Sequence, residues 1–224
     1  MAKFCTNCGK KLNDGEVCDC NKSSEIMNNE IIQKLLSVYR GIVYVPVDTM
    51  GNFIKKSNFT LAMILSGILS VICGIFAMAF LKAGFLTTMY YGLHNMGGIE
   101  IPYAKVFFTT LVIVFAISFV YSGILYVVNT QIFKRECDFK EVYTMYSVSS
   151  SILSLFLISA TILFFVNTVL GLAVVTLGSL LFNVYFYTGL KFLGNKDENK
   201  YGYIYLVTYV AFFIFIYVLS KILS

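Results

Sequence analysis

The sequence predicts an all-α integral membrane protein with five transmembrane helices and a small N-terminal zinc ribbon. Three observations predict this class. Apolar residues make up 58% of the chain and charged residues 13%, against about 45–50% and about 25% in soluble domains. Residues 142–190 contain no Asp, Glu, Lys or Arg, and a helix needs about 20 apolar residues to cross a bilayer. Four of the six cysteines lie within the first 20 residues.

The apolar runs predict helices rather than a transmembrane barrel. Barrel strands alternate apolar and polar residues over about ten positions, whereas the runs here are unbroken and about twice that length. Asn167 and Thr168 interrupt the longest run and predict a tight hairpin, and Asp138 and Glu141 have the spacing of a capping box before the third span. The expected spans cover residues 59–81, 105–129, 142–166, 168–190 and 201–222.

The N-terminal cysteines predict a zinc site in residues 1–22. Cys-x-x-Cys-Gly is a zinc knuckle, because its tight turn lets two thiolates face one ion and glycine supplies the backbone freedom. The second pair, Cys-x-Cys, is one residue shorter than the usual knuckle. A reduced or disulfide-bonded cluster without metal is the alternative. We expect one structural zinc ion with the ligands Cys5, Cys8, Cys18 and Cys20.

The predicted zinc site is structural rather than catalytic. Four protein ligands leave no open position for water or substrate, and a module of this size buries too little core to fold without its metal. Thiolate ligands also place the module in a reducing compartment. Its lysines are offset by Asp14, Glu16, Asp19 and the charge of the zinc–thiolate centre, so nucleic acid is not an expected partner.

Residues 23–58 are expected to form a linker and interfacial amphipathic helices before the membrane domain, residues 59–224. Apolar residues recur at helical spacing from Ile31 to Tyr39 with polar residues between them. A second short amphipathic segment follows Pro46, with Asp48 as its expected N-cap. Beside a span, such helices lie in the plane of the membrane interface or pack on the protein's own spans.

The distribution of Lys and Arg predicts the orientation of the spans. With the N-terminus inside, the inner segments hold fourteen of these residues and the outer segments three. Basic residues accumulate on the cytoplasmic side of membrane proteins. We therefore expect a multi-pass protein of the cell membrane, with a cytoplasmic N-terminus and the C-terminus outside. Abundant Lys, Asn, Ile, Phe and Tyr suggest an AT-rich genome and a bacterial source.

Polar and small residues within the spans predict packing contacts. In the first span, a stripe of small residues recurs every fourth position and is expected to face another span. The third span carries a serine face, and Asn183 in the fourth is expected to join two helices rather than to bind a substrate. These residues are Ala62, Ser66, Ser70 and Gly74 in the stripe, and Ser147, Ser150, Ser151 and Ser154 in the serine face.

The sequence contains no set of residues typical of an active site. It has one histidine, His94, which with Glu100 is expected to lie in a solvated loop. The centres of the predicted spans lack the ionisable residues that pumps and proton-coupled transporters use. Cys73 is interpreted as a packing residue, and Cys137 has no special neighbours beyond basic residues. We therefore expect no catalytic residues and no enzymatic activity.

The layout resembles the Yip family of Rab-interacting membrane proteins. The segments that carry the resemblance are residues 4–12, similar to the zinc ribbon of bacterial members, residues 45–49 before the first span and residues 138–142 before the third. The resemblance implies a cytoplasmic N-terminus, five spans and no catalytic residues. The eukaryotic members act in vesicle trafficking and membrane shaping, but a bacterial member would lack Rab partners.

Three functions compete at this point. The first is a non-enzymatic membrane scaffold or adapter, in which the zinc ribbon docks a cytosolic or membrane protein partner or organises the lipid bilayer, and which could form a homo-oligomer. The second is a small permease or channel that uses Asn183, the serine face and tyrosines as an uncharged pathway. The third is a redox or zinc sensor. The missing ionisable residues favour the scaffold.

Overall fold

The structure, a computed structural model, describes residues 3–4, 11–12, 22–56, 58–82, 102–194 and 200–223. They belong to two compact units, Met1–Arg40 and Gly41–Ser224. The first unit holds two paired strands and most of α1 (Lys22–Tyr44), which includes the amphipathic segment expected from Ile31 to Tyr39. Because α1 begins at Lys22, the linker expected before that segment is helical in the structure. The predicted domain boundaries at residues 22 and 58 stay predictions.

Five described helices of the second unit are long and apolar enough to cross a membrane. This confirms an all-helical protein of multi-pass membrane character. The helices begin and end within three residues of the predicted bounds. They are α3 (Phe59–Phe80), α5 (Tyr103–Val127) continued by the π-helical turn η3 (Val128–Ile132), α6 (Phe139–Phe164), α7 (Thr168–Leu190) and α8 (Tyr201–Leu223).

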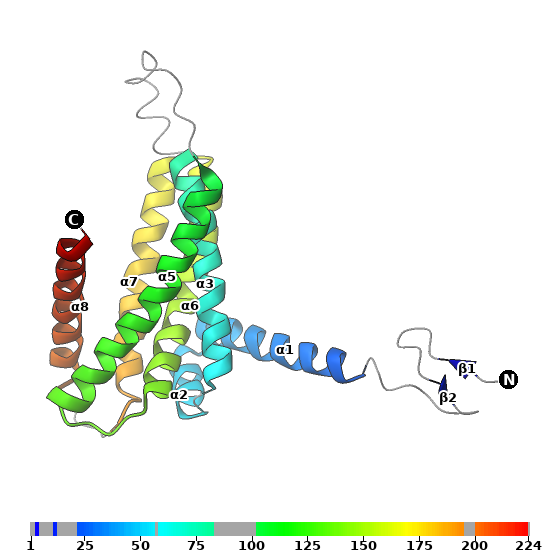
Figure 1. Ribbon diagram of the computed structural model, residues 1–224, viewed down its shortest axis with the longest axis horizontal. Coiled ribbons are helices and arrows are strands. Elements are labelled where there is room, and N and C mark those ends of the chain that lie inside the picture. Colours follow the sequence, from blue (N-terminus) through cyan, green and yellow to red (C-terminus); the bar gives the residue numbers. More distant parts are fainter. Residues whose placement is uncertain are drawn as a thin grey trace, which may run out of the picture. The chain divides into compact units, whose positions relative to one another are not determined.

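Helix α6 is the centre of the bundle. It packs against α3, α5 and α7, which run beside it in Figure 1. All residues from 142 to 152 are buried. Its first turn carries the predicted capping box, in which Glu141 Oε2 accepts a hydrogen bond from the backbone N–H of Asp138 at 3.3 Å. The capping box satisfies backbone donors that the start of a helix otherwise leaves unpaired.

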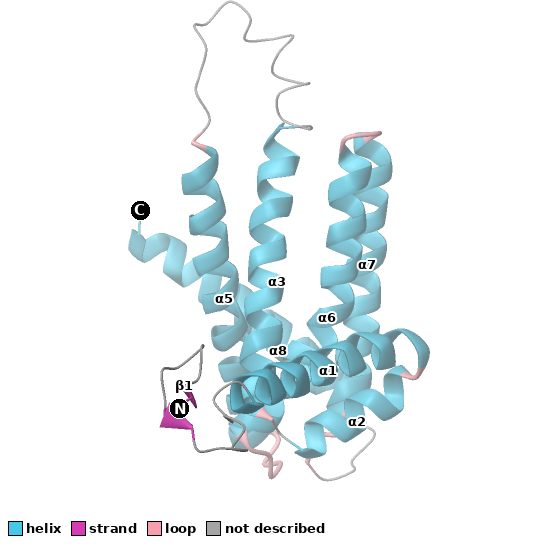
Figure 2. Ribbon diagram, turned by 90° about the vertical axis from the view of Figure 1, so that its right-hand side faces the viewer, coloured by secondary structure: helices cyan, strands magenta, loops and turns pink. Residues whose placement is uncertain are grey.

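A tight hairpin joins α6 to α7, as the sequence predicts. Asn167 is the N-cap of α7, and its side-chain oxygen accepts from the backbone N–H of Val169 at 2.8 Å. The two helices then pack closely because α7 has glycines at the contact. A β-carbon added to Gly178 would lie 2.5 Å from Cβ of Phe156 on α6. Figure 2 shows the hairpin from the side.

The small-residue stripe of α3 faces other spans, which confirms that prediction. All four of its residues are buried. The hydroxyls of Ser66 and Ser147, on α3 and α6, lie 2.8 Å apart. Farther along, a β-carbon on Gly74 would lie 2.7 Å from the ring of Phe107 on α5. The stripe therefore lets α3 approach two neighbours, as small residues do in lipid.

The short helix α2 (Pro46–Lys56) packs against α6 and α7. The predicted N-cap is wrong, because α2 begins at Pro46 and Asp48 lies within its first turn. Proline suits the first helical position, since it lacks the N–H that would be unpaired there. Thr49 Oγ1 donates to Val45 O at 2.8 Å, a bond within the first turn. Gly51 lies against the ring of Phe192, and this contact places α2 beside the end of α7.

Candidate functional site

The predicted zinc ligands Cys5, Cys8, Cys18 and Cys20 lie outside the described residues. Beside them, strand β1 (Lys3–Phe4) pairs antiparallel with β2 (Lys11–Leu12), with Lys3 opposite Leu12. Among the described residues, no three His, Cys, Asp or Glu side chains lie together as a metal site would require. The zinc site stays a prediction.

The serine face of α6 is buried, and its hydroxyls bond mainly to their own helix. Ser66 makes the cross-helix contact: because Ser147 Oγ donates to Tyr143 O at 2.9 Å, the proton between the two serines comes from Ser66. The other three hydroxyls donate to carbonyls three or four residues earlier in α6, at 2.7–3.0 Å; they are Ser150, Ser151 and Ser154. The four serine hydroxyls are therefore used in hydrogen bonds within the helix bundle and do not line an open channel.

Asn183 joins α7 to α8. Its Oδ1 accepts from Tyr205 Oη at 2.6 Å and also from Tyr209 Oη, and its Nδ2 donates to Ser179 O at 2.7 Å. The amide therefore uses its acceptor twice and one of its donors once. Aromatic rings pack around it at tilted angles, with the ring centres of Tyr205 and Tyr209 4.8 Å apart and those of Phe186 and Tyr205 5.9 Å apart. This geometry fits the expected role in helix packing.

Four buried hydroxyls in the same bundle have no hydrogen-bond partner among the described residues. They are Tyr121 and Ser122 on α5 and Thr144 and Ser149 on α6, each at most 5% exposed. Buried polar groups nearly always find a partner, which can be an ordered water. These four positions are therefore places in the bundle where an ordered water would be favourable.

Arg135 is the one buried charged residue of the described part of the chain that sequence reasoning missed. It is 6% exposed, and its guanidinium donates to Asn129 Oδ1 at 3.1 Å and to Leu193 O. Its central carbon lies 4.9 Å from the centre of the Tyr201 ring, which is a cation–π distance. Arg135 therefore connects the segment after α5 to the turn after α7 and to the start of α8.

Cys137 lies between η3 and α6 and is half-buried. Burial raises the pKa of its thiol to about 11, and the nearby Arg135 guanidinium lowers it by less. Because the thiolate is the reactive form of cysteine, this thiol is little reactive at neutral pH. Arg135 gives it no special reactivity.

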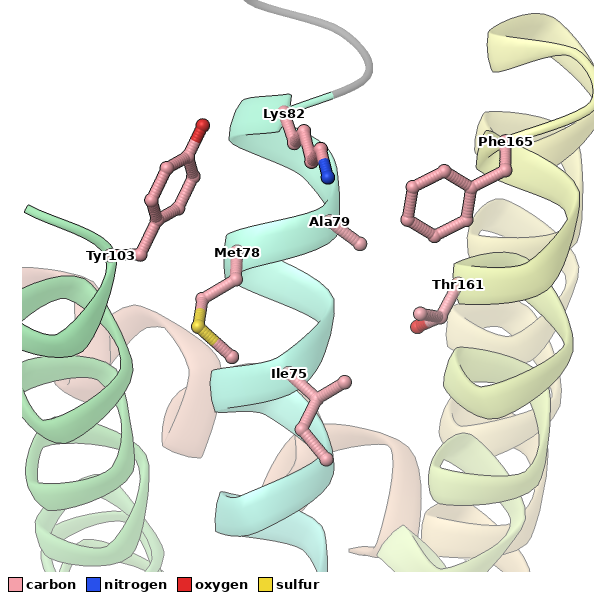
Figure 3. A pocket seen from close by; sticks show the side chains of 7 residues that line it. All are labelled: Ile75, Met78, Ala79, Lys82, Tyr103, Thr161 and Phe165. Atoms are coloured by element: carbon pink, nitrogen blue, oxygen red, sulfur yellow. The ribbon is translucent and has the colours of Figure 1, made fainter. Parts of the chain in front are cut away.

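A cavity of about 320 Å³ lies between the C-terminal ends of α3 and α6 and the start of α5. Figure 3 shows Ala79 of α3 facing Thr161 of α6 and Phe165 in the turn after α6, with Lys82 above Ala79. Lys82 forms no ion pair with a described residue, and Thr161 donates its hydroxyl to Leu157 O at 2.7 Å. The lining residues are Ile75, Met78, Ala79, Lys82, Tyr103, Thr161 and Phe165.

Comparison with known proteins gives no family model, no curated protein and no solved structure that matches this chain. The resemblance to the Yip family therefore stays a prediction. The expected loop residues His94 and Glu100 lie outside the described residues.

Proposed function

We propose that the chain is a non-enzymatic membrane scaffold or adapter of the Yip type, in which a cytoplasmic zinc ribbon docks a protein partner. One observation carries the proposal. The polar side chains that could line a transport path, Asn183 and the serine face, are engaged in hydrogen bonds within and between the helices. Polar groups used in this way stabilise helix contacts in lipid. The bundle then serves as an anchor for the ribbon.

The proposed ribbon binds one zinc ion through Cys5, Cys8, Cys18 and Cys20. The antiparallel pairing of β1 with β2 supports this, because it brackets the segment that holds the first two cysteines. Such a fold-back is what a knuckle needs for two thiolates to face one ion.

The test combines metal analysis with crosslinking in intact membranes. We expect about one zinc per chain in freshly reduced protein, and near zero in the Cys5→Ser variant, because a thiolate ligand is lost. Partner crosslinks should disappear in Cys5→Ser while the spans stay inserted. The matched control is Cys73→Ser, in a span, which should keep both zinc and crosslinks. Zinc-free wild-type protein would contradict the proposal.

The proposed orientation places the N-terminus in the cytoplasm and the C-terminus outside the cell membrane. Contacts support it: Gly51 of α2 touches Phe192, and Arg135 bonds to Leu193, so three segments expected inside lie at one end of the bundle. Phe165 and Lys82 line one cavity at the other end. With 26 and 23 residues, α6 and α7 are each long enough to cross about 30 Å of hydrocarbon.

Cysteine labelling tests this orientation. In a background without native cysteines, single cysteines at Thr168, His94 and Ser224 should react with an impermeant reagent in intact cells. One at Lys196 should react only after permeabilisation. Labelling of Lys196 from outside would overturn the orientation, and an unreactive Thr168 would show that α6 and α7 re-enter the membrane without crossing it.

A small permease or channel is the second candidate. The hydroxyls of Ser122, Thr144 and Ser149, which have no hydrogen-bond partner in the described part of the chain, favour it. A chain of waters on these groups would give an uncharged path. Solute or water flux through purified protein in liposomes, abolished by Ser149→Val and kept by the exposed Ser159→Ala, would support this function over the scaffold. Equal leakage in both variants and in empty liposomes would exclude it.

A further inference from the structure

We propose that the cavity at the ends of α3, α5 and α6 binds one phospholipid with an anionic head group. Its walls are apolar except for the Lys82 ammonium and the Tyr103 phenol, since the Thr161 hydroxyl is already bonded. A single cation above an apolar space matches an anionic amphiphile. The volume of about 320 Å³ is at the lower end of the range of about 300–1,000 Å³ that small-molecule sites occupy, so the cavity would hold part of the lipid while its acyl chains continue into the bilayer.

The depth of the cavity in the membrane matches this ligand. Helix α3 has 22 residues and is therefore about 33 Å long, close to the hydrocarbon thickness of about 30 Å. Lys82, just after the end of α3, then lies at the level of the lipid phosphates. Ile75 lies about 10 Å deeper along the helix, where the acyl chains begin. The cavity thus extends from the head-group region into the hydrocarbon.

The charge of the lining favours an anionic lipid over a zwitterionic one. No described residue forms an ion pair with Lys82, so its charge is available to a ligand. A lysine near anionic head groups contributes about 1 kcal/mol, which is a preference of about fivefold. Tyr103 suits the same depth, because tyrosines gather at membrane interfaces. Figure 3 shows Ala79 as the small residue that leaves room beside Phe165.

The experiment uses the absence of tryptophan from the chain. Phe165→Trp in the full-length protein places a single fluorophore at the cavity. The protein is reconstituted in vesicles of equal parts phosphatidylcholine and phosphatidylglycerol, with bromine on the acyl chains of one lipid or the other. Bromine quenches only when its chain touches the tryptophan. Because composition is constant, unequal quenching reports a binding preference.

We expect brominated phosphatidylglycerol to bind about fivefold better than brominated phosphatidylcholine at this tryptophan. The preference should fall to about one in Lys82→Gln and persist in Lys105→Gln, a lysine of α5 that does not line the cavity. Val169→Trp, an exposed reporter at the start of α7, should show no preference. Ala79→Leu should fill the cavity and reduce quenching by both lipids.

Several results would overturn the proposal. Equal quenching by the two lipids at Phe165→Trp would show bulk lipid rather than a bound one. If the preference for phosphatidylglycerol persisted in Lys82→Gln, Lys82 would not be its cause. If Lys105→Gln removed the preference as fully as Lys82→Gln does, general surface charge rather than the cavity would attract the lipid. Melting temperatures of the lysine variants, which should match the parent because Lys82 and Lys105 are exposed, exclude misfolding as the cause.

Discussion

Helices α6 and α8 are both long and apolar, yet α6 lies at the centre of the bundle and α8 at its periphery. Of their most apolar segments, 56% of α6 is buried inside the protein but only 11% of α8. The difference lies in the residues. Ser147, Ser150, Ser151 and Ser154 are small and let neighbours approach α6, whereas α8 is rich in large rings and is exposed throughout residues 213–221. In lipid, small residues rather than hydrophobicity bring helices together.

Helix α8 contacts the rest of the bundle mainly through its first half. Tyr201, Ile204 and Thr208, in its first half, are buried, and the bonds to Asn183 also come from this half. Its second half has an apolar surface that lipid or another chain can cover. If α6 is packed on all sides and α8 only along its first half, matched substitutions in the two helices should have unequal effects.

The largest effect is expected where α7 meets α6. Gly178→Leu would drive a side chain into Phe156, because even a β-carbon there lies 2.5 Å from that residue. Overpacking costs about 1–3 kcal/mol, so thermal unfolding in detergent should show a clearly lower melting temperature. Gly202→Leu on α8 is the control, since nothing lies within 4 Å of its β-carbon, and should change stability by less than about 0.5 kcal/mol. Equal losses of stability in Gly178→Leu and Gly202→Leu would show that α7 and α8 do not differ in how tightly they are packed at these positions.

A smaller and local effect is expected at the junction of α7 and α8. Asn183→Leu removes the acceptor of the Tyr205 and Tyr209 hydroxyls, and hydrogen bonds between helices in lipid are worth about 0.6 kcal/mol on average and about 1.7 at most. Amide hydrogen exchange should rise in the first half of α8 and stay unchanged in α6. Thr188→Val, which loses only a bond to its own helix, should leave exchange in α8 unaltered.

The smallest effect is expected at the contact of α3 with α6. Ser147→Ala leaves the buried Ser66 hydroxyl without its acceptor and should lower the unfolding free energy by about 0.6 kcal/mol. Ser220→Ala on α8, an exposed hydroxyl bonded to its own helix, should be neutral. If the two substitutions cost the same, the Ser66–Ser147 contact does not stabilise the bundle.

Several features follow from the sequence because they depend on neighbouring residues. Span number and length follow from unbroken apolar runs. The capping box of Asp138 and Glu141 and the hairpin at Asn167 depend on spacings of a few residues. The α3 stripe follows from one residue type recurring on one helix face. The start of α2 is also local, but Pro46 and Asp48 give competing signals, and the structure begins the helix at the proline.

Other features were decided only by the tertiary structure. Every basic residue in residues 134–140 gives the same local signal, and Arg135 becomes buried because Leu193 and Tyr201, far along the chain, meet it. The cavity beside Lys82 is lined by residues that are far apart in the sequence, from Ile75 to Phe165, and that only the packing of the helices brings together. Likewise, α6 is central and α8 peripheral although both are apolar. An apolar run shows that a helix belongs in lipid, but contacts between distant segments decide which of its faces the lipid touches.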